Sequence, residues 1–309
     1  MNLDTVVQVK NLVKKYGDFV AVNGISLNIQ KGECFGILGP NGAGKSSLLR
    51  ILYGSSQLTS GDVFILGLNV HNHMSEIKSR IGVVPQDDGL DTDLTVFENL
   101  KIFGQFYDLD EKVISEKTDQ LLRMMKIEDK ADRAVDTLSG GMKRRLAVAR
   151  GLINSPEILF LDEPTTGLDP QARRWIWDFF KELKNQNSTL VLTTHYMEEA
   201  EFLCDRIAIV DHGKILALGT PAELIYEQIG REVVEFDAKS SDLNYYVQKL
   251  KAQNFEYQVY HQTVHIFIKD DQSAKDVIQL FSSDRIMIRK PTLNDVFLRL
   301  SGSQLRDES

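Results

Sequence analysis

The sequence has few of the features that mark membrane-spanning, secreted or disulfide-rich proteins. No stretch approaches the roughly 18 consecutive apolar residues that a membrane-spanning helix needs, and the N-terminus has no signal-peptide core. The two cysteines, Cys34 and Cys204, form no C-x-x-C pair and indicate neither a disulfide framework nor a zinc site. We therefore expect a soluble, intracellular protein whose cysteines are buried and reduced.

An excess of basic charge is also missing. The chain has 36 Lys and Arg residues against 44 Asp and Glu residues, which gives a formal net charge of -8. This balance offers no electrostatic basis for a nucleic-acid surface, so we interpret the cluster Lys143-Arg144-Arg145 as a local helix face. At 309 residues, 42 % of them hydrophobic, the chain has an ordinary globular composition and is long enough for two domains.

One glycine-rich turn has the spacing of a phosphate-binding loop. Residues 39–46 read Gly-Pro-Asn-Gly-Ala-Gly-Lys-Ser, which fits the pattern G-x-x-x-x-G-K-S. Its glycines allow the backbone to take conformations that a Cβ forbids, so successive N–H groups can wrap a phosphate. Lys45 would then reach the β- and γ-phosphates, and the Ser46 hydroxyl would hold Mg²⁺.

The segments on either side of this turn support the interpretation. Residues 33–38 are a plausible buried strand, and residues 47–53 a helix that Gly54 ends. The positive N-terminal end of such a helix favours a bound phosphate. A purely structural glycine-rich turn is the alternative.

A second apolar run, Ile158–Leu161, ends in Asp162 and Glu163. In a P-loop nucleotidase, Asp162 would hold Mg²⁺ through water, and Glu163 would orient and deprotonate the attacking water. A strand that leads into an acidic turn is the alternative.

The order of predicted elements indicates a mixed α/β protein. Residues 6–13 and 20–29 predict an antiparallel hairpin, and residues 61–66 could join its sheet. Helical periodicity runs from 94 to about 154 and predicts a helical insertion. Three short apolar runs with helices between them then predict a parallel sheet. They span residues 157–161, 189–194 and 206–210.

The last part of the chain predicts a separate small domain over 231–309. Thr220, Pro221 and Glu223 predict a capped helix that Gly230 ends. The pattern then restarts in the order βαββαβ, a ferredoxin-like α+β arrangement. Its elements are expected at 231–237, 241–253, 255–260, 263–268, 273–282 and 285–289, followed by a helix at 293–300 and a polar tail.

Residues 138–142, Leu-Ser-Gly-Gly-Met, open a predicted helix that runs to about Asn154. Ser139 and the glycine amides would form an anion site at that helix N-terminus. Together with the P-loop, this second phosphate site resembles the nucleotide-binding subunits of ATP-binding cassette (ABC) transporters, whose signature is Leu-Ser-Gly-Gly-Gln. Met142 departs from that signature and loses a polar side-chain contact. The serine and glycine amides are intact, so we expect hydrolysis to survive.

The resemblance covers about residues 6–230, with every motif in family order, and implies an ABC cassette with antiparallel and helical subdomains. Tyr16 would stack on adenine, although a core-edge tyrosine is an alternative. Asp169 would contact the opposing ATP site. The resemblance implies these ATP-binding residues: Tyr16, Gly39, Pro40, Asn41, Gly42, Ala43, Gly44, Lys45, Ser46, Ser47, Ser139, Gly140, Gly141 and Asp169.

The resemblance also implies the catalytic and metal-binding residues. Lys45, Gln86, Glu163 and His195 would act in catalysis, with His195 contacting the γ-phosphate and Gln86 sensing the membrane subunit. Ser46, Gln86 and Asp162 would bind Mg²⁺. The role assigned to His195 rests mostly on its order and spacing among the motifs, because a lone histidine after a strand is usually structural.

The implied function is an ATPase that powers transport. Two copies of the chain, or one copy and a related cassette subunit, would sandwich two ATP molecules and drive a separate transmembrane permease. The protein would then be cytoplasmic and peripherally attached to the cytoplasmic face of the membrane. Residues 195–201 and 291–297 resemble the multidrug, antibiotic-resistance and nodulation-factor exporter branch, which favours export.

Two other classes remain open. Soluble ABC ATPases of translation or DNA repair usually carry a second cassette or a long coiled-coil insertion, and this sequence has neither. A P-loop kinase would not need residues 138–142. Two further polar groups are interpreted as solvated rather than functional: the pair His71 and His73, and the segment Glu198–Glu201, which reads as an exposed helix face.

Overall fold

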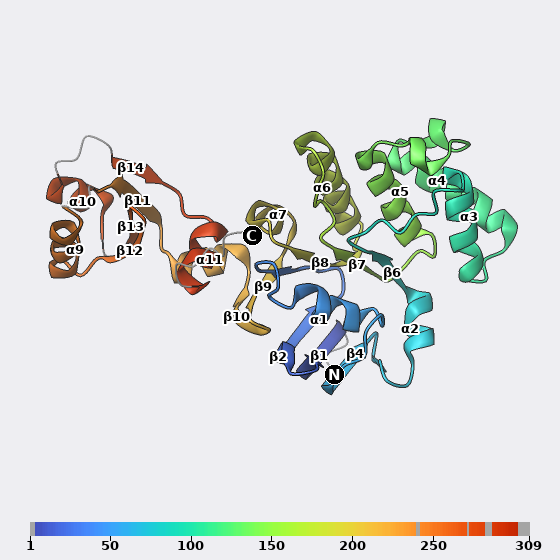
Figure 1. The fold of residues 1–309 in the computed structure, drawn as a ribbon, viewed down its shortest axis with the longest axis horizontal. Helices are drawn as coiled ribbons and strands as arrows, with labels where there is room; N and C mark the ends of the chain where they lie inside the picture. The colour runs from blue at the N-terminus through green and yellow to red at the C-terminus, as the bar shows by residue number, and fades with distance from the viewer. Residues whose placement is uncertain (1–3, 239–241, 271, 282–285, 302–309) are drawn as a thin grey trace. The chain divides into compact units, whose positions relative to one another are not determined.

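The structure is a computed structural model, and it describes residues 4–238, 242–270, 272–281 and 286–301 (Figure 1). Contacts between Cα atoms divide the chain into two compact units, residues 1–216 and 217–309. Within the described residues, no helix is both long enough and apolar enough to cross a bilayer.

An antiparallel sheet opens the first unit. Its strands lie in the order β2-β1-β4-β5 and are β1 (Thr5–Tyr16), β2 (Phe19–Gln30), β4 (Ser60–Ile65) and β5 (Leu68–Asn69). The predicted hairpin is confirmed, and β4 pairs antiparallel with β1 as expected. In β1, alternate side chains such as Val7 and Val9 are buried, as the period of a half-buried strand requires.

The second sheet of this unit has the order β10-β9-β3-β8-β7-β6. Its strands are β3 (Cys34–Leu38), β6 (Ile81–Val84), β7 (Ile158–Asp162), β8 (Thr189–Thr194), β9 (Arg206–Asp211) and β10 (Lys214–Gly219). The pairs from β9 through β3, β8 and β7 to β6 are all parallel, which confirms the predicted parallel sheet. Every residue of β3, β7 and β8 is buried, as expected for strands covered on both faces.

The helices of the first unit are α1 (Lys45–Leu52), α2 (Met74–Arg80), α3 (Val96–Phe106), α4 (Glu111–Met125), α5 (Gly140–Leu152), α6 (Pro170–Asn185) and α7 (Met197–Leu203). Leu48 and Ile51 of α1 join a core cluster that includes Val9 of the antiparallel sheet and Phe160 of the parallel sheet. In Figure 1, α3, α4 and α5 gather beside β6, in the predicted helical insertion. This arrangement leaves the P-loop between β3 and α1, at the carboxyl end of a central strand.

The second unit has a four-stranded antiparallel sheet in the order β12-β13-β11-β14. Its elements are α8 (Pro221–Gln228), β11 (Glu232–Asp237), α9 (Leu243–Ala252), β12 (Glu256–Tyr260), β13 (Thr263–Ile268), α10 (Ala274–Leu280), β14 (Ile286–Arg289) and α11 (Leu293–Ser301). The predicted βαββαβ order is confirmed, and so is the capping box of Thr220 and Glu223.

The contact boundary at 216/217 falls inside β10, whereas the sequence predicts a boundary at 230. The difference concerns α8, which packs against α11. The predicted polar tail, residues 302–309, lies outside the described residues.

Candidate nucleotide site

The glycines of the P-loop are needed where the backbone crowds its neighbours. A Cβ on Gly39 would stand 2.1 Å from the carbonyl oxygen of Val210, and one on Gly44 would stand 2.1 Å from that of Ala21. Gly42 and Gly44 also have φ angles of +78° and +101°, which side chains with a Cβ rarely adopt. The loop therefore has the open backbone path that a phosphate cradle requires.

Lys45 and Ser46 begin α1 and face the end of β7. The Ser46 hydroxyl donates to Asp162 Oδ1 at 2.9 Å, and the Thr193 hydroxyl donates to the same oxygen at 2.6 Å. Lys45 Nζ lies 3.0 Å from the Pro40 carbonyl oxygen, which curls the side chain back over the loop. Burial lowers the pKa of Lys45, while the neighbouring carboxylates act in the opposite direction.

Glu163 is the meeting point of the remaining catalytic candidates. Its Oε1 lies 3.3 Å from Lys45 Nζ, and its Oε2 lies 3.1 Å from His195 Nδ1. The Thr166 hydroxyl donates to Oε2 at 3.1 Å. The hydrogen bond with His195 and the charge of Lys45 lower the pKa of Glu163 to about 2, although burial opposes this shift. The carboxylate is therefore ionised throughout the neutral pH range.

The backbone of Glu163 is also special. Its φ angle is +46°, in the left-handed region that a glutamate rarely occupies. The Thr193 hydroxyl accepts a hydrogen bond from the Glu163 amide at 3.0 Å, which holds this turn at the strand end. Such strain commonly marks functional positions, and here it aims the carboxylate at the P-loop.

Ser46 and Asp162 offer the kind of oxygen ligands that a magnesium ion takes. Their oxygens are hard ligands, they lie within hydrogen-bond distance of each other, and the Thr193 hydroxyl orients the carboxylate. Gln86 is exposed, and its backbone carbonyl accepts from Arg144 Nη1 at 3.4 Å. The structure thus brings Lys45, Ser46, Asp162, Glu163 and His195 together and places Gln86 on a neighbouring loop.

Tyr16 stands at the end of β1 with 48 % of its surface exposed, so the core-edge interpretation is wrong. A hydrogen bond with Ser56 and a further one with Ser47 lower the pKa of its hydroxyl, and burial has the opposite effect. The Tyr16 hydroxyl thus lies near Ser47, in the first turn of α1. Phe19, which pairs with Tyr16 across the hairpin, is 62 % exposed and was not identified from the sequence.

Ser139 and Asp169 each begin a helix. The Ser139 side chain accepts from the Met142 amide at 3.3 Å as the N-cap of α5, and Asp169 accepts from the Ala172 amide at 2.8 Å as the N-cap of α6. Ser139 and Gly140 are exposed, and a Cβ on Gly140 would meet open space. Among the described residues, no hydrogen bond or ion pair joins the segment 139–141 to the P-loop of the same chain.

The sequence predicts that Arg144 belongs to a local helix face, but its side chain is buried. Its Nε donates to the Pro164 carbonyl at 2.6 Å, and its Nη1 donates to the Pro85 carbonyl at 2.7 Å and to Asp88 Oδ1 at 3.0 Å. One guanidinium therefore ties α5 to the Gln86 loop and to the loop after Glu163. The planar fork of arginine suits such a junction.

The expectation of an exposed helix face is wrong for two of the four residues of Glu198–Glu201. Glu198 and Glu201 are exposed, whereas Glu199 and Ala200 are both 0 % exposed. A seven-residue helix has too few turns for its apolar period to distinguish its inner face from its outer one. His71 and His73 are exposed, as expected. Cys34 and Cys204 are free and buried, as expected.

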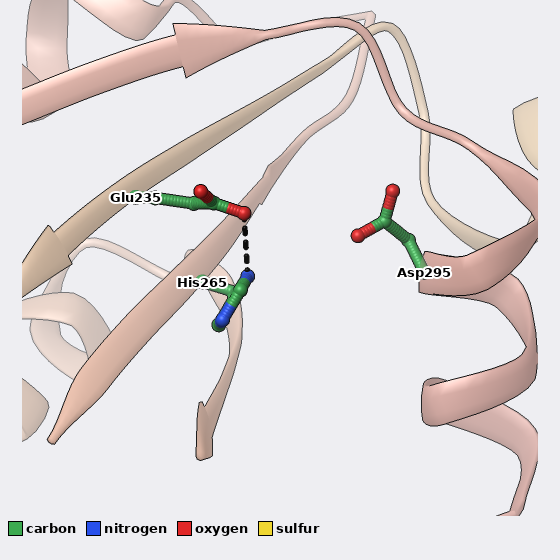
Figure 2. Close-up of side chains that lie close together, drawn as sticks. All are labelled: Glu235, His265 and Asp295. Atoms are coloured by element: carbon green, nitrogen blue, oxygen red, sulfur yellow. Dashed lines mark ion pairs between the residues drawn. The ribbon is translucent and has the colours of Figure 1, made fainter. Parts of the chain in front are cut away.

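A second group of possible metal ligands lies in the second unit (Figure 2). Glu235, His265 and Asp295 bring ligand atoms within 4.8 Å of one another. The Arg289 guanidinium already bridges both carboxylates, with Nε 2.7 Å from Glu235 Oε1 and Nη1 2.8 Å from Asp295 Oδ2. Although burial alone would raise it, the pKa of Asp295 lies below its usual value because Arg289 and Thr292 bond the carboxylate. Arginine supplies the positive charge here, and the cluster joins α11 to the sheet.

Comparisons with known proteins agree with this geometry. A family described as ABC transporter matches residues 22–166. A Nod factor export ATP-binding protein I from Cupriavidus metallidurans is 41 % identical over 305 residues, covering 99 % of this chain and 100 % of the relative. Its counterpart from Rhizobium meliloti is 43 % identical over 302 residues, covering 97 % of this chain and 89 % of the relative.

Two solved structures share the fold. One is a dimeric, post-hydrolysis ATP-binding cassette bound to ADP and Pi, with a TM-score of 0.64 and 30 % identity over 69 % of this chain and 98 % of that chain. The other, from Clostridium perfringens, is part of an ABC transporter complex. Its TM-score is 0.66, with 30 % identity over 72 % of this chain and 92 % of that chain.

Proposed function

The chain belongs to the ABC transporter family of ATPases, and from this we propose that it powers export through a separate membrane permease. The observation that supports ATP hydrolysis is that Lys45 and His195 both contact Glu163 beside the P-loop. In the solved cassette described as a post-hydrolysis state, the ligands are ADP and Pi, the products of this reaction.

The contacts of Glu163 suggest how ATP activates the site. Lys45 and His195 now stabilise the ionised carboxylate, which makes it a weak proton acceptor. The same two side chains are the proposed partners of the γ-phosphate. When they turn to the phosphate, the Glu163 carboxylate loses both and its pKa rises toward its ordinary value. Glu163 then becomes a better base for the attacking water.

Magnesium would be held by Ser46 and Asp162, with Gln86 from the neighbouring loop. When bound, the ion neutralises charge on the phosphate oxygens. The Thr193 hydroxyl keeps Asp162 Oδ1 directed toward Ser46. Hydrolysis should therefore stop when EDTA removes divalent cations and return when Mg²⁺ is restored.

We propose that the working form is a dimer in which each ATP lies between two chains. The exposed Ser139 and Gly140, together with the half-buried Gly141, would cover the ATP held by the P-loop of the second copy, and Asp169 would contact the opposing site. The absence of any bond between segment 139–141 and the described P-loop of the same chain supports this arrangement. A related cassette subunit is the alternative partner.

Export is favoured by the names of the relatives, which are Nod factor export proteins. We infer a location at the cytoplasmic face of the membrane, beside the permease. Soluble ABC ATPases and P-loop kinases find no support in these comparisons. For residues 231–309 we propose a dimer-stabilising or regulatory role.

The experiment that tests this function is a pair of assays on wild type and Lys45→Ala. Wild type should hydrolyse ATP and co-purify with a membrane protein, and Lys45→Ala should lose nearly all hydrolysis. Wild-type turnover in the variant would refute the site assignment. Purification of the active ATPase without a membrane partner would refute the transport role.

A further inference from the structure

Glu199 is a buried carboxylate that the proposed chemistry of ATP hydrolysis does not use. It lies in α7, four residues after His195, and is 0 % exposed. Its Oε1 accepts hydrogen bonds from the Thr165 hydroxyl at 2.7 Å and from the Trp177 indole Nε1 at 2.8 Å. Burial raises the pKa of this carboxyl, whereas the side chains of Thr194, Thr165 and Trp177 and the charge of Arg173 lower it.

The two donors come from opposite sides of the Asp169 segment. Thr165 lies in the loop between Glu163 and Asp169, and Trp177 lies in α6, which Asp169 caps. One oxygen of Glu199 therefore ties α7 both to this loop and to the helix that follows it. Asp169 therefore lies between two residues, Thr165 before it and Trp177 after it in the sequence, that both donate to Glu199.

A second contact joins the same elements. The Arg173 guanidinium of α6 lies 4.3 Å from the centre of the Tyr196 ring, and that ring lies 4.1 Å from the ring of His195. The His195 turn and the start of α6 are thus held together at two places. A displacement of His195 would therefore disturb both the Glu199 hydrogen bonds and the contact between Arg173 and Tyr196.

An aliphatic side chain of similar size would fill this position at lower cost, because a buried carboxyl requires its hydrogen bonds to be made. The directional bonds to Thr165 and Trp177 account for one oxygen of the carboxylate, Oε1, whereas the buried Oε2 has no hydrogen-bond partner among the described residues. A merely space-filling role does not require them.

We propose that Glu199 is a positioning residue that couples His195, at one ATP site, to Asp169, which faces the other site of the dimer. The inference rests on the proposed roles of His195 and Asp169. Engagement of His195 by ATP moves the start of α7, and the Glu199 bonds carry this movement to the Asp169 segment. Loss of the Glu199 bonds therefore weakens the cooperativity between the two ATP sites.

The test compares Glu199→Met, which has no comparable acceptor, with Glu199→Gln, which keeps an acceptor oxygen for both donors. We expect Glu199→Met to lower kcat by about 10-fold or more and to abolish cooperativity in ATP, with ATP affinity changed by less than about 3-fold. Glu199→Gln should restore most of kcat. The matched control is Glu198→Met on the exposed face of the same helix, which should behave as wild type.

Trp177 supplies a spectroscopic readout that a structural role alone would not move. The chain has two tryptophans, so Trp175→Phe leaves Trp177 as the sole tryptophan, which can be excited apart from the tyrosines. In this background ATP should shift the emission of Trp177 when position 199 is Glu or Gln, and the shift should vanish with Met. If Glu199→Met fails to fold, Thr165→Val removes one of the same bonds from the other end and should also weaken cooperativity.

Two results would overturn the inference. The first is wild-type kcat and cooperativity in Glu199→Met, or in Thr165→Val if only that variant folds. The second is an ATP-dependent shift of Trp177 emission that remains unchanged in Glu199→Met. Failure of the proposed function looks different, because Lys45→Ala would then remain active. Loss of hydrolysis in Lys45→Ala beside normal Glu199 variants would refute the coupling alone.

Discussion

At the scale of single residues, Glu163 is the most constrained group in the site. Its carboxylate contacts Lys45, His195 and Thr166, and its backbone takes a left-handed conformation. These contacts stabilise the ionised form. In the proposed mechanism, Glu163 becomes a better base when the γ-phosphate takes these partners.

The pKa of Glu163 predicts a pH dependence of stability in the absence of nucleotide. The value is near 2 in the folded chain and 4.5 for an unperturbed glutamate. Stability from this group is present above pH 4.5 and is lost as pH falls through about 2. The difference is worth up to about 3 kcal/mol. Urea unfolding between pH 7 and 3 should show a steeper loss for wild type than for Glu163→Gln.

The control for this measurement is Glu198→Gln, an exposed carboxylate on α7, whose curve should follow wild type. Parallel curves for wild type and Glu163→Gln would contradict the strong stabilisation of the Glu163 carboxylate.

Sequence patterns predict the residues of the site better than they predict the buried side chains that surround the site. The spacing of Lys45, Ser46, Asp162 and Glu163 follows from local motifs, and the structure brings them together. Sequence patterns do not predict the burial of Glu199 and Arg144, because their side chains bond partners 20 or more positions away, such as Trp177 and Pro85. Local periodicity says nothing about such bonds.

At the scale of elements, Arg144 joins three segments that surround the site. Its guanidinium donates to the loop before Gln86 and to the loop after Glu163, while its backbone belongs to the signature helix α5. The signature and both loops are therefore fixed by one side chain.

Replacing Arg144 by Lys should lower kcat by about 10-fold or more and reduce the Tm, because one ammonium cannot reach the same acceptors as a planar fork. Lys143→Gln, at the preceding position, should leave both quantities near wild type. Steady-state ATP hydrolysis and thermal unfolding provide the two readouts. Full activity and an unchanged Tm in Arg144→Lys would show that the junction is dispensable.

Most elements were predictable because their patterns are local and strong. The capping box at Thr220 and the alternation in β1 are examples. The strand β6 was not predicted, because four apolar residues without alternation give too short a signal. Its place at the sheet edge is set by pairing with β7.

At the scale of the whole molecule, the second unit has its own sheet and core. Val234, Ile266 and Val277 are among the members of that core cluster. The Arg289 cluster ties α11 to this sheet, and α11 packs against α8. The role proposed for residues 231–309 therefore concerns a segment whose described residues form a sheet with its own core.

Removal of this body should weaken ATP-dependent dimerisation and the activity of the membrane complex, while each chain still binds ATP. Two truncations separate the contribution of α8 from that of the residues after it. One removes residues 231–309, and the other removes residues 220–309 and therefore also α8. Both are compared by light scattering and by ATP hydrolysis with the permease. Unchanged dimerisation and activity in both truncations would refute a dimer-stabilising or regulatory role.

The central claim is that an ATP site is complete only when two copies close over it. The direct test is the mass in solution of Glu163→Gln with and without ATP and Mg²⁺. Hydrolysis should fall by about 100-fold or more while ATP still binds. The 35.0 kDa chain should then double its mass when ATP is added. A variant that binds ATP, stays at its monomer mass and hydrolyses at the wild-type rate would contradict the claim.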